Sequence, residues 1–503
     1  MLVEITQAML IALVAAPLLT AGVAWSRGPR MSMLIGRLGA WVAGLCFVGA
    51  AALATTRGVS VGTGVAGLTA DRVAVVLLLL VFGISAVVQA FAVRYLAGDP
   101  RAAWFTAGAG LLTGASAALV TATTLVGLAV GWTTAGIALC LLLATYRQLP
   151  SARDGVRRTA TAFLIGDAAL WAAVGLVAAR RGTVDLRDLA AQPLSGPLAA
   201  VVAVLIVVAA LSRSAQFPFH RWLPATLAAP TPVSALLHAG VVNAGGILLV
   251  RLYPLGSAGV ISGLAIAAGA ATMAYGAVIM LVKPDVKGAL AHSTTAQMGF
   301  MMLTCGLGLW AAAVIHLVAH GFYKATLFLS TGSAIAHRRR MAALPHAQPL
   351  TGRRRGATLA TSVLLPLVAL LSAATLLPSP HGSHASAHAL LLFAWVTGAA
   401  TTWGWLQRRA NLRGIVAAAA FLFPAAFAYM GVVNAVSTYL APALPLTALP
   451  GPTAWSIVAV ALMTLAGLAA LRWSSPANPV HRTLYTRALS AGHLYPRPTG
   501  VRS

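Results

Sequence analysis

Long apolar runs, separated by short loops rich in arginine, follow one another along the whole chain of 503 residues. A helix needs about 20 apolar residues to cross a bilayer, and about 15 runs are long enough. The pattern therefore predicts an all-α, polytopic integral membrane protein with about 15 transmembrane helices. The predicted helices lie near residues 5–25, 33–54, 73–93, 103–121, 124–145, 159–179, 198–216, 231–250, 258–282, 287–307, 309–335, 358–378, 387–406, 413–437 and 453–472.

One stretch interrupts this pattern, because residues 211–232, LSRSAQFPFHRWLPATLAAPTP, contain four prolines. Proline lacks a backbone N–H and clashes with the preceding turn, so a continuous helix cannot form here. Unwound backbone survives at membrane depth only where it is buried or lines a water-filled cavity, and secondary transporters bind ions at such breaks. The stretch predicts a broken helix with Arg213 at an internal ion path. The alternative is an interfacial loop from which Arg213 reaches outward to the head groups.

The composition is that of a membrane protein, since 59% of the residues are hydrophobic and only 8% are charged. The net charge of +26 comes mostly from arginines between the apolar runs. We interpret them as topology signals and contacts to membrane lipids, and we expect no nucleic-acid binding. Their alternation predicts an outside N-terminus and a cytoplasmic C-terminus in the cell inner membrane. We divide the chain into a core (1–340), additional transmembrane helices (341–475) and a cytoplasmic basic tail (476–503).

Lysine is rare in this chain, where the 34 basic residues include only Lys283, Lys287 and Lys324. A buried lysine can lose its proton near neutral pH, whereas arginine stays charged. His316, His320 and Lys324 are spaced at i, i+4 and i+8, on one face of a predicted helix. A charge at membrane depth costs about 2.5 to 3.5 kcal/mol, so this face should turn inward, where it could pass protons. The alternative is a satisfied cluster that only packs helices together.

Other polar residues inside apolar runs extend this candidate path. Asp167 is the one acid well within an apolar run, and a buried carboxylate needs a cation, which Arg213 could supply. His238 lies in the next predicted helix and could tune that pair. Lys287 stands at the start of another helix, with His292 deeper along it. We consider Lys287 either a head-group anchor or an internal proton carrier.

No cofactor is expected on this chain. The three cysteines are isolated from one another, so they form no CxxC metal site and no iron–sulfur ligand set. The sequence contains no dinucleotide fingerprint and no P-loop. We therefore expect a transporter subunit and not an enzyme, with any chemistry carried out by a partner.

Three long motifs resemble the antiporter-like membrane subunits of respiratory complex I and of Mrp-type cation antiporters. They are SAQFPFHRWLPATLAAPTPVSALLHAGVVNAGG, DVKGALAHSTTAQMGFMMLTCGLG and AAAVIHLVAHGFYKATLFLSTGS, within roughly residues 65–335. Within that superfamily they look most similar to the membrane subunit of the DAB inorganic-carbon accumulation complex. The resemblance implies inverted structural repeats, and it implies that the core at residues 1–340 is an antiporter-like proton-translocation core. It also implies a large peripheral cytoplasmic partner that resembles a zinc β-carbonic anhydrase, so that zinc is expected on the partner.

The sequence also departs from the complex I pattern. Those subunits carry a glutamate after GW in the fifth helix and a lysine in the broken helix, where this chain has Thr133 and Arg213. The lysine of the second half has no counterpart after Leu344. Arginine can bias the charge state of a neighbour, but it cannot relay a proton. These losses agree better with the carbon-transport subunit.

The sequence therefore predicts the cation-conducting subunit of an inorganic-carbon (CO2/bicarbonate) transporter, with the proton as the expected cation. Three alternatives remain open. They are a proton-pumping subunit of a complex I or hydrogenase-type complex, a Mrp-type Na+/H+ antiporter subunit, and a non-conducting anchor for an enzyme. The residues predicted to form the proton path are Asp167, Arg213, His238, Lys287, His292, His316, His320 and Lys324.

Overall fold

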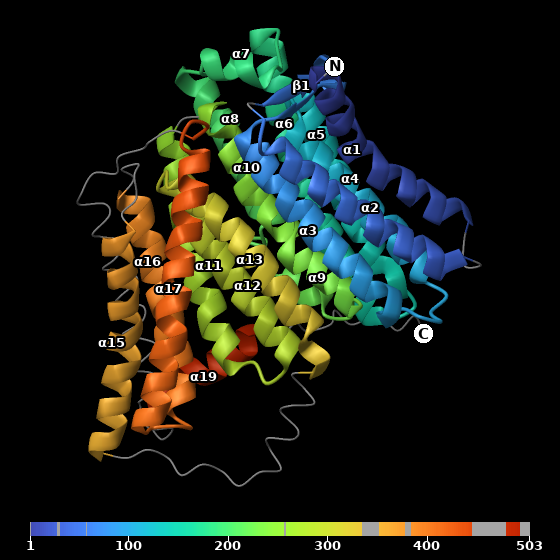
Figure 1. Ribbon diagram of the computed structural model, residues 1–503. Coiled ribbons are helices and arrows are strands. Elements are labelled where there is room, and N and C mark those ends of the chain that lie inside the picture. Colours follow the sequence, from blue (N-terminus) through green and yellow to red (C-terminus); the bar gives the residue numbers. More distant parts are fainter. Residues whose placement is uncertain are drawn as a thin grey trace. The chain divides into compact units, whose positions relative to one another are not determined.

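The computed structural model describes residues 2–27, 31–56, 58–255, 258–333, 352–377, 384–444 and 479–492. Most of these residues are helical, and 12 helices among them are long and apolar enough to cross a membrane (Figure 1). The predicted all-α, polytopic fold class is confirmed. The predicted helix at 453–472 lies outside the described residues, as do the predicted boundaries after residues 340 and 475.

The chain folds into two compact units. The first comprises Met1–Gly308, Leu317–Gly332 and Trp455–Ser503, and the second comprises Leu309–His316 and Ser333–Ala454. The boundary between the units therefore divides one helix, α13 (Trp310–Leu329). The other long helices described in the first unit are α1 (Leu2–Arg27), α2 (Ser32–Leu53), α3 (Arg72–Tyr95), α4 (Ala102–Thr121), α5 (Leu125–Leu143), α6 (Pro150–Arg181), α8 (Gly196–Arg213), α9 (Thr231–Ala239), α10 (Ala244–Leu252), α11 (Ala258–Val282), α12 (Val286–Gly306) and α19 (Pro479–Gly492).

Several helices begin and end at residues with recognised capping chemistry. Asp71 accepts a hydrogen bond of 2.8 Å from a backbone N–H in the first turn of α3, and Asp285 caps α12 in the same way. Pro150 occupies the first turn of α6, where its missing N–H costs nothing. Gly182 follows the last residue of α6 with a left-handed φ of 68°, which favours glycine. These residues set the ends of helices whose length is decided by the apolar runs.

A short β-hairpin, which the apolar pattern does not predict, lies at one end of the first unit. Strands β1 (Val59–Val61) and β2 (Leu68–Ala70) pair antiparallel. The small helix α7 (Leu186–Ala191) lies at the same end (Figure 1). An isolated bridge pairs Thr124, at the start of α5, with Asp185, in the loop after α6. Strand-type hydrogen bonds therefore connect helix ends at this face.

The predicted broken helix is confirmed. The helix α8 (Gly196–Arg213) ends inside the proline-rich stretch, and the chain becomes regular again at α9 (Thr231–Ala239). The unwound backbone between them finds partners in the protein. For example, the N–H of Phe217 donates a hydrogen bond of 3.0 Å to the hydroxyl of Thr272 on α11. Unwound backbone is tolerated at membrane depth only when it is satisfied in this way or by water.

The second unit contains three long helices in its described part: α15 (Gly352–Leu376), α16 (His384–Leu406) and α17 (Leu412–Leu440). A side-chain amide of α17, that of Asn434, donates a hydrogen bond of 2.8 Å to the carbonyl oxygen of Leu377 just after α15. The buried core of this unit consists of Ala369, Leu370, Ala373, Ala426 and Met430.

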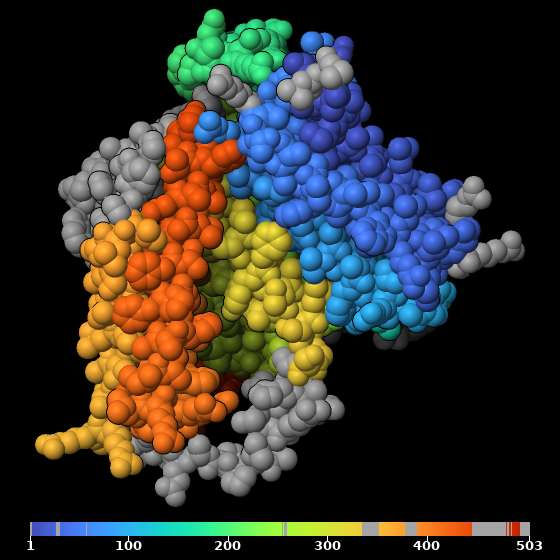
Figure 2. Space-filling view, viewed as in Figure 1, coloured from blue at the N-terminus to red at the C-terminus, as the bar shows by residue number. Residues whose placement is uncertain are grey.

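The outer helices of the first unit present apolar side chains to their surroundings. Leu19 on α1 is 69% exposed, and Trp41 and Leu45 on α2 are 72% and 67% exposed. These two helices form part of the blue surface in Figure 2. Large exposed apolar surfaces of this kind are stable in lipid and not in water. The chain is therefore a multi-pass membrane protein.

Candidate functional site

A buried ion pair forms where the broken helix packs against α6. The Nη2 atom of Arg213 donates a hydrogen bond of 2.7 Å to Oδ1 of Asp167. The two side chains are 1% and 15% exposed. Arg213 is the last residue of α8, and Asp167 lies near the middle of α6. The structure thus brings together the two residues that the sequence predicts as a pair.

Aromatic side chains surround the guanidinium of Arg213. Its Cζ lies 4.4 Å from the ring centroid of Trp132 and 4.0 Å from that of Phe163. Nη1 donates to the backbone oxygen of Trp132 at 3.2 Å. The indole N–H of Trp132 donates to the same carboxylate oxygen of Asp167 at 2.7 Å. Arginine stacks on aromatic rings and keeps its proton when buried, so this site holds a fixed positive charge.

Three residues of this site were not identified from the sequence: Trp132, Phe163 and Gly136. A Cβ at Gly136 would lie 2.8 Å from Nη1 of Arg213, so the close approach requires glycine. The sequence did offer a reason to select Trp132, because it belongs to the GW motif that the family resemblance singles out. It offered no reason to select Phe163, since an aromatic residue one turn before Asp167 is common in an apolar helix.

Thr133 occupies the position where the resemblance leads us to expect a glutamate. Its hydroxyl accepts a hydrogen bond of 3.1 Å from the indole N–H of Trp171 on α6. The carboxylate that pairs with Arg213 comes instead from Asp167. In this chain the charge pair therefore joins α6 to α8, and not α5 to α8.

Lys324 is buried in the part of α13 that belongs to the first unit. Its side chain is 1% exposed, and Nζ donates a hydrogen bond of 2.6 Å to the hydroxyl of Ser293 on α12. His320, one turn earlier, is 3% exposed. His316 belongs to the second unit, where its ring packs edge-on against Phe393 at 5.5 Å. Lys324 and His320 are therefore interior groups of one unit, and His316 is an interior group of the other.

His238 on α9 packs against α13, the helix that carries Lys324. Its ring stacks on Phe328 with the centroids 4.3 Å apart. Among the described contacts none joins His238 to Asp167 or Arg213, so its predicted tuning of that pair stays a prediction.

Lys287 and His292 face the broken segment and its neighbours from α12. Nζ of Lys287 donates a hydrogen bond of 3.3 Å to the carbonyl oxygen of Ala229, near the end of that segment. His292 is 1% exposed, and within the described part of the chain neither ring nitrogen has a hydrogen-bond partner. Its ring lies 6.1 Å from that of Tyr275, which is 4.8 Å from the ring of His220. These residues form a second polar group at the break.

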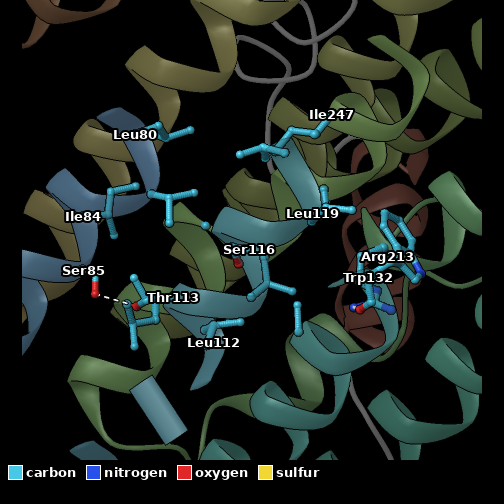
Figure 3. Close-up of a pocket in the computed structure, with 17 residues that line it drawn as sticks. Leu80, Ile84, Ser85, Leu112, Thr113, Ser116, Leu119, Trp132, Arg213 and Ile247 are labelled. Carbon is cyan, nitrogen blue, oxygen red and sulfur yellow. Dashed lines mark hydrogen bonds between the residues drawn. The ribbon is translucent and has the colours of Figure 1, made fainter. Parts of the chain in front are cut away.

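A cavity of about 50 Å³ adjoins Arg213 on the side of α3 and α4. Figure 3 shows Ser85, Thr113 and Ser116 among its lining residues, together with Trp132. One water molecule needs roughly 10–15 Å³ of such space together with polar partners. The cavity is therefore large enough to hydrate the guanidinium.

The first unit contains the fixed charge of Arg213, the carboxylate of Asp167, the buried amine of Lys324 and several imidazoles. Buried amines and imidazoles can bind and release protons within a membrane protein. Within the residues that the structure describes, no group of three or more His, Cys, Asp or Glu side chains is placed to hold a metal ion. The arrangement suits the movement of a small cation.

Two family models match the sequence. The family described as "NADH:quinone oxidoreductase/Mrp antiporter, TM" matches residues 122–406, more than half of the chain. The family described as "NADH-Ubiquinone oxidoreductase (complex I), chain 5 N-terminus" matches residues 64–106.

Several curated proteins are similar in sequence. The probable inorganic carbon transporter subunit DabB1 of Halothiobacillus neapolitanus is 36% identical over 360 residues, which are 67% of this chain and 64% of that protein. The probable inorganic carbon transporter subunit DabB of Bacillus subtilis is 37% identical over 275 residues (53% of each chain). NADH-quinone oxidoreductase subunit L of Mycobacterium tuberculosis is 36% identical over 275 residues (54% of this chain, 43% of that protein). The chain thus spans less than two thirds of the length of these relatives.

Two solved structures share the fold. A chain of the Mrp complex from Dietzia sp. DQ12-45-1b superposes with a TM-score of 0.61 and 23% identity, over 98% of this chain and 62% of that one. A chain of respiratory complex I from Thermus thermophilus with bound NADH gives a TM-score of 0.57 and 22% identity, over 86% of this chain and 94% of that one.

Proposed function

The chain is a member of the NADH:quinone oxidoreductase/Mrp antiporter family, and from this premise we propose that it is the proton-conducting membrane subunit of an inorganic-carbon transporter. In this proposal its partner is a large peripheral cytoplasmic subunit that resembles a zinc carbonic anhydrase. The chain conducts the ion, and the hydration of CO2 to bicarbonate takes place at the zinc of the partner. The complex lies in the cell inner (plasma) membrane, with the C-terminus of this chain in the cytoplasm.

Similarity in sequence supports carbon transport over the other roles of the family. Relatives from Halothiobacillus neapolitanus and Bacillus subtilis are described as probable inorganic carbon transporter subunits. The match to one of them extends over 360 residues, whereas the match to complex I subunit L extends over 275. The replacement of the expected glutamate by Thr133 also favours a subunit that differs from the complex I pump.

The observation that carries the ion-conducting role is the burial of Lys324. An amine in an apolar interior costs free energy, and membrane proteins retain such groups mainly where ions or protons move. Lys324 is almost fully buried, and it donates its hydrogen bond to a neutral hydroxyl. A protein that only anchors an enzyme has no use for this arrangement.

We place the conformational response to ion movement at the ion pair of Asp167 and Arg213. A cation that moves along the path and approaches Asp167 competes with Arg213 for its carboxylate. Arg213 keeps its own charge, so the link between α6 and α8 weakens while the cation is near. The pair re-forms when the cation has passed, and the partner responds to this alternation.

Replacement of Lys324 tests the proposal. We expect Lys324→Ala to abolish carbon-dependent growth rescue while the complex still assembles, because the buried amine of the path is lost. Lys283→Ala, which removes a half-buried lysine outside the proposed path, should leave rescue intact. Unimpaired rescue by Lys324→Ala would end the assignment. Purification of the intact complex, with identification of its subunits and zinc content, tests the partner separately.

A respiratory or hydrogenase-linked proton pump is the second candidate. It is favoured by the similarity to subunit L of Mycobacterium tuberculosis and by the shared fold with a chain of complex I. The same purification distinguishes the two functions. Co-purified quinone-reducing and iron–sulfur subunits would support the pump, and a large zinc-containing subunit would support carbon transport.

A further inference from the structure

A chain of buried polar side chains leads away from the Arg213 cavity between α3 and α4. The hydroxyl oxygens of Ser85 and Thr113, which line that cavity, are 2.7 Å apart (Figure 3). Gln89, one turn further along α3, donates from Nε2 to the hydroxyl of Ser85 at 2.8 Å. These three side chains are only 1% to 4% exposed. The ion-pair mechanism makes no use of them.

A second cavity, of about 40 Å³, lies on the other side of Gln89. It is lined by Gln89 and Thr106, and it reaches the loop between α3 and α4 at Gly98. Gln89 therefore stands between the cavity at Arg213 and a cavity at the end of α3. The two cavities and the side chain between them form a line toward one face of the membrane.

Two polar atoms on this line are buried without a hydrogen-bond partner among the described residues. One is Oε1 of Gln89, and the other is Nε of Arg213. A buried polar group without a partner costs about 1–3 kcal/mol, so such groups need an explanation. Each cavity exceeds the roughly 10–15 Å³ that one water needs. Arg213 lines the first cavity and Gln89 lines the second, so water in the cavities would lie beside both side chains.

We propose that the two cavities form a hydrated branch that connects Arg213 with the membrane face at the end of α3, and that Gln89 is its gate. The amide of Gln89 holds the branch closed by its hydrogen bond to Ser85. Its carbonyl oxygen lies against α2, where a Cβ at Gly39 would be only 2.4 Å away. Rotation of this amide joins the two cavities.

The role of the branch rests on the proposed function. Water that reaches Arg213 raises the local dielectric constant and so weakens its attraction for Asp167. The branch would then set how readily the ion pair opens. Its existence, however, can be tested without any measurement of transport.

Accessibility to silver ions tests whether the branch holds water. In a full-length variant whose three native cysteines are replaced by alanine, Ser116→Cys places a thiol in the cavity, and Ala117→Cys places one at the neighbouring buried position of α4. Ag+ moves only through water, so we expect the thiol at 116 to react at least about tenfold faster than the thiol at 117. Equal rates would overturn the branch.

A substitution of Gln89 that keeps the two cavities apart tests its role as the gate. In the Ser116→Cys background, Gln89→Leu puts an apolar side chain of similar size between the two cavities, and no rotation of that side chain offers water a polar partner. We therefore expect the variant to slow the reaction with Ag+ to the rate at 117 and to lower proton flux through the intact complex. Thr121→Val, which removes a buried hydroxyl of α4 outside the cavity, should change neither. If Gln89→Leu leaves the Ag+ rate unchanged, Gln89 is not the gate. If the wild type conducts no protons but position 116 still reacts, the proposed function fails and the branch stands.

Discussion

Removal of the guanidinium of Arg213 leaves the carboxylate of Asp167 buried without its cation. Breaking a buried ion pair in this way costs more than replacing both partners. We expect Arg213→Met to lower the free energy of unfolding by about 3 kcal/mol. The double variant Asp167→Asn/Arg213→Met should regain most of that stability and still conduct no protons. Thermal unfolding in detergent and proton uptake by reconstituted complex measure the two effects, and a double variant as unstable as the single one would contradict the pairing.

At the scale of single residues, the sequence reveals charges better than their surroundings. Asp167 and Arg213 are recognisable because a charge within an apolar run must find a partner. The rings of Trp132 and Phe163, which enclose Arg213, cannot be recognised from the sequence. Aromatic residues are common in membrane helices, and which of them meet depends on how each helix is rotated. The placement of His316 in the second unit is equally hidden, because spacing along one helix does not show where the packing divides.

Close packing of two helices holds the ion pair in place. A Cβ at Gly166 on α6 would lie 1.8 Å from the hydroxyl oxygen and 2.8 Å from the Cβ of Ser212 on α8. Gly166→Ala should therefore separate the helices beside Asp167, lower the unfolding free energy by about 1–3 kcal/mol and impair conduction. Gly175→Ala on the same helix is the matched control, because nothing lies within 4 Å of its Cβ position. Equal melting temperatures of the two variants would show that α6 and α8 are not so tightly packed.

Apolar length and helix breakers predict elements well in this protein. The long helices follow the apolar runs, and the prolines between Arg213 and Thr231 locate the break between α8 and α9. The hairpin β1–β2 could not be predicted from apolar length or helix breakers, because each strand has only three residues and their pairing depends on loop geometry. The bridge from Thr124 to Asp185 joins residues too far apart in the chain for any local pattern to indicate it.

For the whole molecule, the alternation of arginine clusters predicts which loops face the cytoplasm. The two ends of α6 provide a direct test. Arg157, near its start, is 57% exposed, and Gln192, beyond its end, is exposed. Arg157→Cys should react with a membrane-impermeant maleimide only from the cytoplasmic side, and Gln192→Cys only from the outside, in vesicles of known orientation. Labelling of both from one side would contradict the predicted topology.

The bridge between Thr124 and Asp185 also bears on how movement spreads through the protein. It ties the loop after α6 to the start of α5, so backbone hydrogen bonds hold this end of α6 in place. Asp167 is 14 residues and Pro150 is 31 residues from the end of α6 at Arg181. On a rigid helix, a swing that shifts Asp167 shifts Pro150 by about twice the distance, because rise is uniform along the axis. A tilt of α6 about its anchored end would therefore displace its first turn more than it displaces Asp167.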